Sequence, residues 1–463
     1  MNTRNTTLVA LPLLASAALL YAQQAAQAPT AAGAGAPQAV RTAAGPVQGE
    51  GYQTQYIRLG QQGEGLLYKP ATPNPKSRIA LTYTHPGANN FMAPIGRELA
   101  SRGYLVMMVN YRGDLEQGVD AQLPTVSAAV AYLRTLPGVQ RVIVTGHSGG
   151  AHEMALYENV AENGVKACNG PEKIYPCQAR GLENLQKPDG VIILDPPLGA
   201  FHGMSSIDPA VDKDANVRNP ALDMFSAANG FDASAKRAQY SADFARRFYA
   251  AQGKRNNDVL AHALERLRAV EQGKGRYSND EPLEVPGLGE DANGARLYQT
   301  DASFAAHTKA PHMLLKADGS RPVQIIQSVR SPASQAASQL RALGVTSTTS
   351  TLRGYLAHAA IRTTAEYAIT ADDIIGVDWR SAYDSAPGNA YGIAAPALVL
   401  AMGCHYLLVP GELIYDRLAS RDKTYVAVEG ATHGFTPCKP EYGDTTRRTF
   451  DYIDEWLSKA GRF

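Results

Sequence analysis

A five-residue stretch, Gly146-His147-Ser148-Gly149-Gly150, carries the residue types that a hydroxyl nucleophile needs. It follows a β-branched run, 139–145, and a helical pattern begins directly after it. A serine on such a strand-to-helix turn is held in strained backbone geometry, and the flanking glycines let neighbouring backbone come close. The turn exposes the serine hydroxyl and directs the Gly149 N–H, at a helix N-terminus, towards an oxyanion. We therefore predict Ser148 as a nucleophile and Gly149 as an oxyanion donor.

A histidine late in the chain can supply the general base that this serine requires. His433 lies just past an apolar run, within Gly430-Ala431-Thr432-His433-Gly434-Phe435. An order of serine first and histidine last suits triads that run serine, acid, histidine along the chain. An imidazole with an ordinary pKa near 6.5 can take the hydroxyl proton and return it to a leaving group. Other histidines near predicted core loops are expected to be structural: His85, His147, His152 and His405.

Strands that are apolar throughout alternate with helical patterns in two parts of the chain. The first part has apolar runs at 79–84, 104–109, 139–145 and 190–194, with helical spacing at 92–102 and 124–136. The rhythm returns with strands at 397–401 and 424–428 and helices at 410–419 and 444–459. Continuous apolar strands indicate a parallel sheet covered on both faces. We predict an α/β fold whose mostly parallel central sheet is flanked by helices.

The stretch between these two parts is mixed and reads as one large insertion. It has helical stretches at 233–251 and 258–272, a charged Gly/Pro-rich loop at 273–296 and many aromatic residues, most of which we expect to be core. At this length, one enlarged domain or a core with an insertion are both open. The predicted organisation is a signal peptide (1–22), a flexible leader (23–50), a core (51–198), a cap or lid (199–390) and the rest of the core (391–463).

The N-terminus has the layout of a secretory signal peptide. Arg4 precedes an apolar run from Leu8 to Leu20, and small residues such as Ala22 follow. The run is short for a membrane span, and no later run is long and apolar enough to be one. We expect an exported protein, periplasmic or secreted, with no stable membrane insertion after cleavage.

Four cysteines fit that compartment. An even cysteine count in an exported chain favours disulfides, and three pairings of the four are possible. We favour the short local loop Cys168–Cys177 together with Cys404–Cys438. The second bridge would pin the loop that follows strand 397–401 to the histidine loop, and alkylation of either thiol in the unreduced protein would contradict it. The absence of CxxC or HxxxH spacing argues against a metal site.

The balance of charge gives little reason to expect a polyanionic partner. The 463 residues include 44 lysines and arginines against 43 aspartates and glutamates, for a net charge of +1. Nucleic-acid binding favours a basic surplus. The apolar content of 44% and the 42 glycines fit an ordinary globular chain.

With these motifs together, the chain resembles the α/β-hydrolase superfamily over about 79–196 and 396–460. The resemblance rests on HPGANN after the first core strand, RGYLVMMVNYRG, GHSGG and GATHGF. It implies a second oxyanion amide near Ala88, and a cap formed by the insertion. A serine at this strand-to-helix turn, the nucleophile elbow, implies an esterase, lipase or peptidase. Enzymes with such a fold act on many different substrates.

The triad acid departs from the pattern of that superfamily. Tyr406 stands where members commonly place aspartate, and a phenol with a pKa near 10 cannot be the anionic partner. Glu412, at the start of a predicted helix, is our first choice. Asp195, which ends strand 190–194, is the second. The remaining candidates are Asp378 and Asp384.

The sequence thus predicts an exported serine hydrolase that cleaves carboxylic esters through a Ser148–His433–acid triad. An acyl-enzyme would form and be hydrolysed by water. Neither a cofactor nor a metal is implied, and the expected partner is a small-molecule ester or amide. Two alternatives stay open: a peptidase or amidase of the same fold, and a non-catalytic binding protein on a hydrolase scaffold.

Overall fold

The centre of the protein is an eleven-stranded sheet with seven neighbouring parallel strands. A computed structural model describes residues 47–49, 51–61, 63–113, 118–213, 217–289, 294–331 and 347–463. In sheet order the strands are β1 (Val47–Gly49), β2 (Tyr52–Leu59), β3 (Gly63–Pro70), β5 (Leu105–Tyr111), β4 (Ile79–Thr84), β6 (Arg141–His147), β7 (Gly190–Leu194), β16 (Ala397–Met402), β17 (Lys423–Val428), β11 (His312–Leu315) and β12 (Val323–Gln324).

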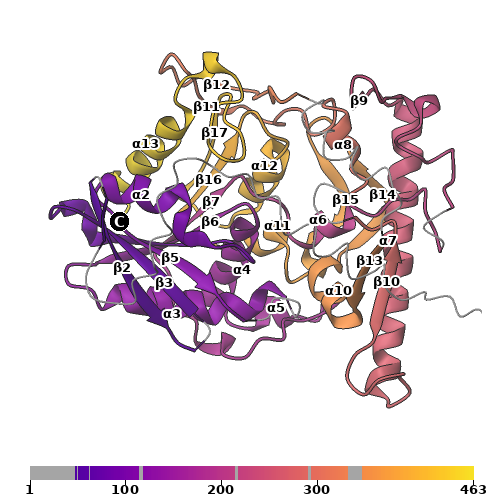
Figure 1. The fold of residues 1–463 in the computed structure, drawn as a ribbon, viewed down its shortest axis with the longest axis horizontal. Coiled ribbons are helices and arrows are strands. Elements are labelled where there is room, and N and C mark those ends of the chain that lie inside the picture. The colour runs from indigo at the N-terminus through magenta and orange to yellow at the C-terminus, as the bar shows by residue number, and fades with distance from the viewer. Residues whose placement is uncertain are drawn as a thin grey trace, which may run out of the picture. The chain divides into compact units, whose positions relative to one another are not determined.

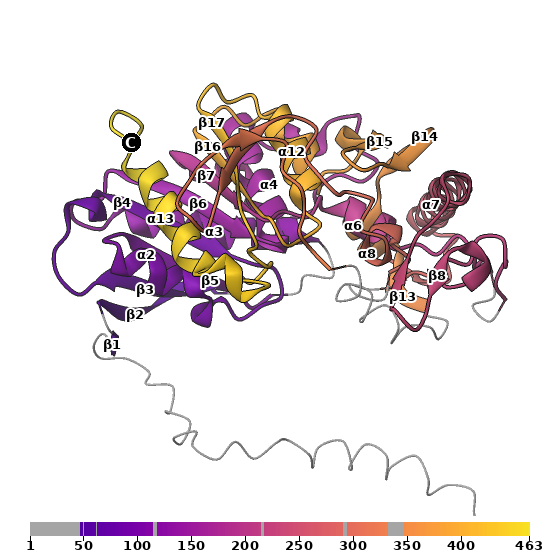
Figure 2. The same ribbon diagram turned by 90° about the horizontal axis from the view of Figure 1, so that it is seen from above.

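Helices cover both faces of this sheet (Figures 1 and 2). One face packs against α2 (Pro94–Ser101) and α13 (Thr445–Ser458), and the other against α3 (Leu123–Arg134), α4 (Gly149–Asn163) and α12 (Leu408–Arg417). Strands β4, β7 and β16 are buried along their whole length. A strand buried on both faces must be apolar at every position, which is the pattern that the sequence shows. The predicted α/β fold is confirmed.

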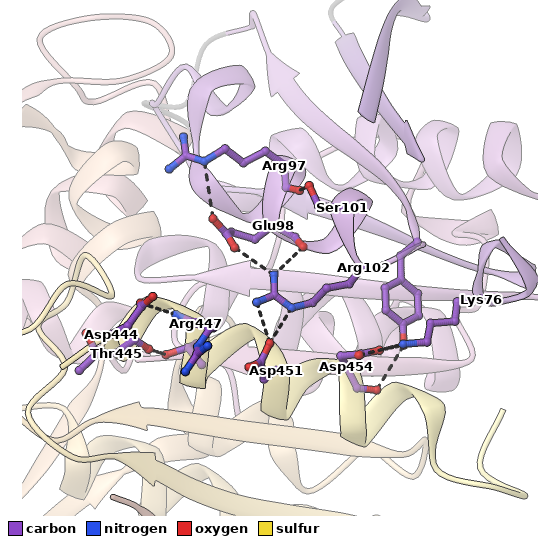
Figure 3. Close-up of polar contacts among 12 residues, drawn as sticks. Lys76, Arg97, Glu98, Ser101, Arg102, Asp444, Thr445, Arg447, Asp451 and Asp454 are labelled. Atoms are coloured by element: carbon purple, nitrogen blue, oxygen red, sulfur yellow. Dashed lines mark hydrogen bonds and ion pairs between the residues drawn. The ribbon is translucent and has the colours of Figure 1, made fainter. Parts of the chain in front are cut away.

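Ion pairs fasten the last helix, α13, to the first half of the chain (Figure 3). Arg102, at the end of α2, contacts Glu98 at 2.9 Å and Asp451 of α13 at 2.8 Å. Lys76 contacts Asp454 at 2.6 Å. These pairs are partly exposed, so each contributes at most about 1 kcal/mol, and the apolar side of α13 contributes more through burial. The helix is thereby fixed beside the loop that carries His433.

The predicted insertion proves not to be continuous. Strand β11 pairs in parallel with β17 through residues 313–315 and so belongs to the core sheet. Strand β12 pairs with β11 at the sheet edge. The prediction of one cap over 199–390 is therefore wrong for this segment. A run of four residues is too short to stand out from the sequence as a core strand. We use "the cap" below for residues 199–308 and 347–390.

The cap is built from one long helix and small antiparallel sheets. Its helices are α6 (Ala200–Met204), α7 (Ala242–Glu271), α8 (Leu297–Thr300), α10 (Leu352–Ala359) and α11 (Ala386–Ala390). Its strand pairs are β8 (Phe231–Asp232) with β9 (Arg237–Ala238), β10 (Pro282–Pro286) with β13 (Ser347–Thr351), and β14 (Arg362–Ile369) with β15 (Ile374–Asp378). Figure 1 shows α7 running beside β10 and β14. The pairing of β10 with β13 joins the cap segments on either side of β11.

The N-terminal predictions are tested only at their last residues. The signal peptide, 1–22, lies outside the described residues and stays a prediction. The leader predicted over 23–50 ends too late, because Val47–Gly49 forms β1, paired with β2. Among the described residues, no helix has both the length and the apolar character needed to cross a bilayer.

Candidate active site

Ser148 lies on the sharp turn between β6 and α4. Its backbone has φ 54° and ψ −128°, a conformation that residues with a side chain rarely adopt. The turn needs glycine on both sides: a Cβ on Gly146 would lie 1.9 Å from the Gly150 carbonyl oxygen, and one on Gly150 would lie 2.0 Å from the Thr84 carbonyl oxygen. The Ser148 N–H donates to the Leu194 carbonyl oxygen at 3.0 Å. The predicted elbow geometry is present, with Ser148 partly exposed.

His433 follows β17, and a buried aspartate orients it. His433 Nδ1 lies 2.6 Å from Asp195 Oδ2. The histidine side chain is 35% exposed and the aspartate side chain 0%. Asp195 comes directly after β7 with φ 42°, and its Oδ1 accepts the Met402 N–H at 3.1 Å. Burial alone would raise the pKa of Asp195, but His405 and His433 hold it far below its ordinary value. The carboxylate is therefore ionised where it meets His433.

The ring of His433 is in contact with two further imidazole rings. The ring of His147, next to Ser148, lies 4.5 Å from that of His433, and its Nε2 lies 2.9 Å from the His433 carbonyl oxygen. The ring of His405 lies 4.6 Å from that of His433, and its Nδ1 lies 2.7 Å from Asp195 Oδ2. The histidine loop is thus joined directly to the serine turn. One side-chain nitrogen or oxygen atom from each of Asp195, His405 and His433 lies within 4.8 Å of the other two.

The expectation that Glu412 is the acid partner of His433 is wrong. Glu412 is 2% exposed, and its carboxylate accepts the N–H groups of Lys309 at 2.6 Å and Ala310 at 2.8 Å. Its Oε1 also lies 2.8 Å from His312 Nε2. These partners fix the segment leading into β11 against α12. The second choice, Asp195, occupies the position expected of the acid.

The two remaining acid candidates serve the cap. Asp378 pairs with Arg362 at 3.3 Å between neighbouring strands β15 and β14. Asp384 Oδ1 lies 2.6 Å from Nδ1 of His152, one turn along α4 from Ser148. The Asp384 carbonyl oxygen accepts the Ala200 N–H at 2.7 Å, so this aspartate links the two ends of the cap to the serine helix.

The loop predicted to give a second oxyanion amide lies beside the elbow. A Cβ on Gly149 would meet Pro86 at 3.2 Å and His85 at 3.4 Å. Asn90 holds this loop in place, since its side-chain amide donates to the carbonyl oxygens of Val109 at 2.7 Å and His85 at 3.2 Å. Ala88 is exposed in the same loop. Gly149 is the first residue of α4, where helix N–H groups lack partners within the helix.

Both predicted disulfides are confirmed, as Cys168–Cys177 and Cys404–Cys438. Cys404 precedes His405, and Cys438 lies in the loop that carries His433. The Cys404 N–H donates to the Ala431 carbonyl oxygen at 2.8 Å. The second bridge therefore holds together the loops that supply His405 and His433.

Loss of that bridge is expected to affect both stability and the site. The double variant Cys404→Ser/Cys438→Ser opens a loop with a sequence separation of 34, which should cost about 3–4 kcal/mol of unfolding free energy. Its kcat should also fall, because both imidazoles lose their tether.

The matched control is Cys168→Ser/Cys177→Ser, with a separation of 9 and about 2–3 kcal/mol expected. Urea unfolding and kcat of both double variants make the comparison. Equal kcat losses would contradict a role for the Cys404–Cys438 bridge in the site.

An apolar pocket opens next to the acid and to His405. Its water-accessible volume is about 20 Å³, room for about one water molecule, so the pocket is narrow. The core contributes the residues just after Asp195 and His405, and the cap contributes the opposite wall. The lining residues are Pro197, Leu198, Phe201, His202, Tyr298, Ala305, Ile369, Ile374, Tyr406, Leu407 and Pro410.

Sequence reasoning missed two contacts in this site, that of His405 with Asp195 and that of His147 with His433. His405 follows strand β16 in the loop where an acid was sought, and that position was the signal for a site residue. His147 is part of the serine motif itself. Both had been expected to be structural, since a lone histidine gives no sign of its neighbours in space.

Comparison with known proteins gives distant structural matches only. No protein-family model and no curated protein matches the chain. Esterase B from Lactobacillus rhamnosis is 19% identical over 33% of this chain, which spans about half (50%) of that protein, with a TM-score of 0.26. A bacterial brefeldin A esterase, a homologue of human hormone-sensitive lipase, is 14% identical over 88% of this chain and 76% of its own (TM-score 0.37). Proline iminopeptidase of Mycobacterium smegmatis is 14% identical over 87% and 97% (TM-score 0.35).

These similarities are too weak to assign an activity. The pairing of strands within this chain gives the order of the sheet, and Ser148 lies between β6 and α4. His433 follows the next-to-last parallel strand of that order. On these grounds the protein has the α/β-hydrolase fold, with a cap inserted between the strands of its core.

Proposed function

We propose that the protein is an exported serine hydrolase that cleaves carboxylic esters with Ser148, His433 and Asp195. The observation that carries the proposal is the 2.6 Å contact between His433 Nδ1 and buried Asp195, in a loop that touches the strained serine turn through His147. Export is supported by the signal-like N-terminus and by two disulfides, which persist in oxidising compartments.

The contact with Asp195 fixes how His433 can act. Nδ1–H donates to the carboxylate, so the lone pair of Nε2 is left to accept a proton. His433 takes the proton of Ser148 as Oγ attacks the ester carbonyl carbon. The carbon–oxygen bond to the alcohol then breaks, and His433 returns the proton to the leaving alkoxide. Water, deprotonated by His433, attacks the acyl-enzyme. The bond between the acyl carbon and Ser148 Oγ then breaks, and His433 returns the proton to Oγ, which releases the acid and regenerates Ser148.

Two backbone amides are proposed to stabilise the oxyanion of each tetrahedral intermediate. Gly149 supplies one from the N-terminus of α4, where the helix dipole favours negative charge. The loop held by Asn90 supplies the other, at or near Ala88. The apolar pocket between core and cap favours an ester whose acyl or alcohol part is small and apolar, because its lining gives few polar partners.

The test is labelling of the purified mature protein with a fluorophosphonate, which forms a bond to an activated serine and releases fluoride. Wild type is expected to be labelled and Ser148→Ala is not, with the adduct located on Ser148 by mass spectrometry. A panel of ester and amide substrates then separates esterase from amidase activity. A folded wild type that takes no label, with its cap intact by limited proteolysis, would count against the proposal.

A further inference from the structure

One oxygen of Asp195 accepts hydrogen bonds from two histidines. Its Oδ2 lies 2.6 Å from Nδ1 of His433 and 2.7 Å from Nδ1 of His405, while Oδ1 is taken by the Met402 N–H. A Ser–His–Asp triad needs only the first of these bonds. The second imidazole therefore competes with the base for the same carboxylate oxygen.

The groups around this pair favour a neutral His405. Burial lowers the pKa of the His405 imidazole, Asp195 opposes that shift, and His433 and the buried guanidinium of Arg330 add to it. Tyr406, whose ring lies 4.2 Å from that of His405 and is tilted by 42°, is also uncharged at neutral pH, since burial raises its pKa to about 12. His405 thus donates one neutral N–H to Asp195 and adds no charge.

The other imidazole in contact with His433, that of His147, is also neutral. Burial, with His433 next in importance, lowers the pKa of His147 to about 3, and His85 acts in the same direction. Among the described residues, Asp195 is the acidic side chain at ion-pair distance from His433, 2.6 Å, and it can stabilise a positive imidazolium. How much of its charge is available to His433 therefore sets how easily the base is protonated.

We propose that His405 is a positioning residue that shares Asp195 Oδ2 and so keeps His433 unprotonated, and active as a base, at lower pH. The proposal rests on the proposed function, because it assigns His433 as the base. A hydrogen bond to a charged oxygen is stronger than one between neutral groups, and two bonds to one oxygen divide its charge between them. Removing the His405 donor leaves the whole oxygen to His433, which favours the protonated base.

Three variants test this through the pH dependence of labelling. His405→Asn keeps an N–H donor, because Asn Nδ2 occupies the position of His Nδ1. His405→Phe keeps a ring without a donor, and His405→Met is a flexible second non-donor that can fill the same space. The second-order rate constant for fluorophosphonate inactivation is measured from pH 4 to 9 on the full mature chain. This rate constant reports the free enzyme's base without the need for a known substrate.

The phenylalanine and methionine variants are expected to move the midpoint of the acidic limb up by roughly half to one pH unit. The asparagine variant should keep the wild-type midpoint. A purely packing role would lower the rate at all pH values with the midpoint unchanged, and that result overturns the proposal. A wild type that takes no label instead counts against the proposed function itself.

A proton NMR spectrum of wild type gives a second readout that needs no non-donating variant to fold. Downfield imidazole N–H signals are expected from the histidines paired with carboxylates, which are His152, His312, His405 and His433. His405→Asn should remove one of them. A set of downfield signals left unchanged by His405→Asn also overturns the shared hydrogen bond.

Discussion

Ser148→Ala is expected to lower kcat/KM for any hydrolysed ester by about 10⁵–10⁶-fold. The nucleophile, the base and the orienting carboxylate act as one unit, so removing the serine removes the acyl-enzyme route altogether. The residual rate comes from substrate binding and the oxyanion amides, which Ser148→Ala leaves in place. Steady-state kinetics on the best ester of the panel measure the effect.

His433→Ala and the double variant Ser148→Ala/His433→Ala complete this experiment. Each single change should cost nearly as much as both together, because a base without its nucleophile has no function. Circular dichroism and urea unfolding check that each variant is folded. Additive losses would mean that the two residues act independently, and would argue against a triad.

Asp195→Asn is expected to lower kcat by about 10⁴-fold with little change in KM. Asparagine fits the same space and can still accept the Met402 N–H, but it cannot carry the charge that stabilises the His433 imidazolium. Its amide NH2 would face Nδ1 of His433 as a donor, and so favours the tautomer with a protonated Nε2, which cannot act as the base. The loss should therefore appear in the chemical step, as seen in single-turnover kinetics.

Glu412→Gln is the matched control, a buried carboxylate changed to an amide at the site first expected to be the acid. Glutamine cannot reproduce all three hydrogen bonds of Glu412, so we expect a loss of about 1–3 kcal/mol in unfolding free energy. The kcat should stay within a few-fold of wild type. The reverse pattern, with Glu412→Gln inactive and Asp195→Asn active, would restore Glu412 as the acid.

The strands and the elbow were predictable because their signals are local. Runs 79–84 and 190–194 coincide with β4 and β7, since a strand buried on both faces leaves an unbroken apolar run. The glycines around Ser148 are required by contacts within the turn and with the next strand. Cys168–Cys177 is a local pairing as well.

The acid and strand β11 were not predictable because they depend on the order of strands in the sheet. Asp195 meets His433 since β7 pairs with β16 and β16 with β17, although 238 residues separate the two side chains. The helix dipole gave Glu412 a local reason to be charged, and that reason holds equally for a structural carboxylate. The helical stretches expected at 233–251 and 258–272 likewise join into α7, because packing overrides weak breaks in local propensity.

The position of β11 in the core sheet restricts the movements by which the cap can give a substrate access to the proposed active site. The chain leaves the core after β7, returns for β11 and β12, leaves again, and comes back at β16. The cap is thus formed by two separate chain segments, each connected to the core at both ends, instead of one segment with a single pair of connections. Such connections disfavour a cap that swings open as one flap, and favour small sliding movements of packed elements when a substrate enters. For the same reason, deleting or exchanging residues 199–390 as one block would also remove strands β11 and β12 from the core sheet.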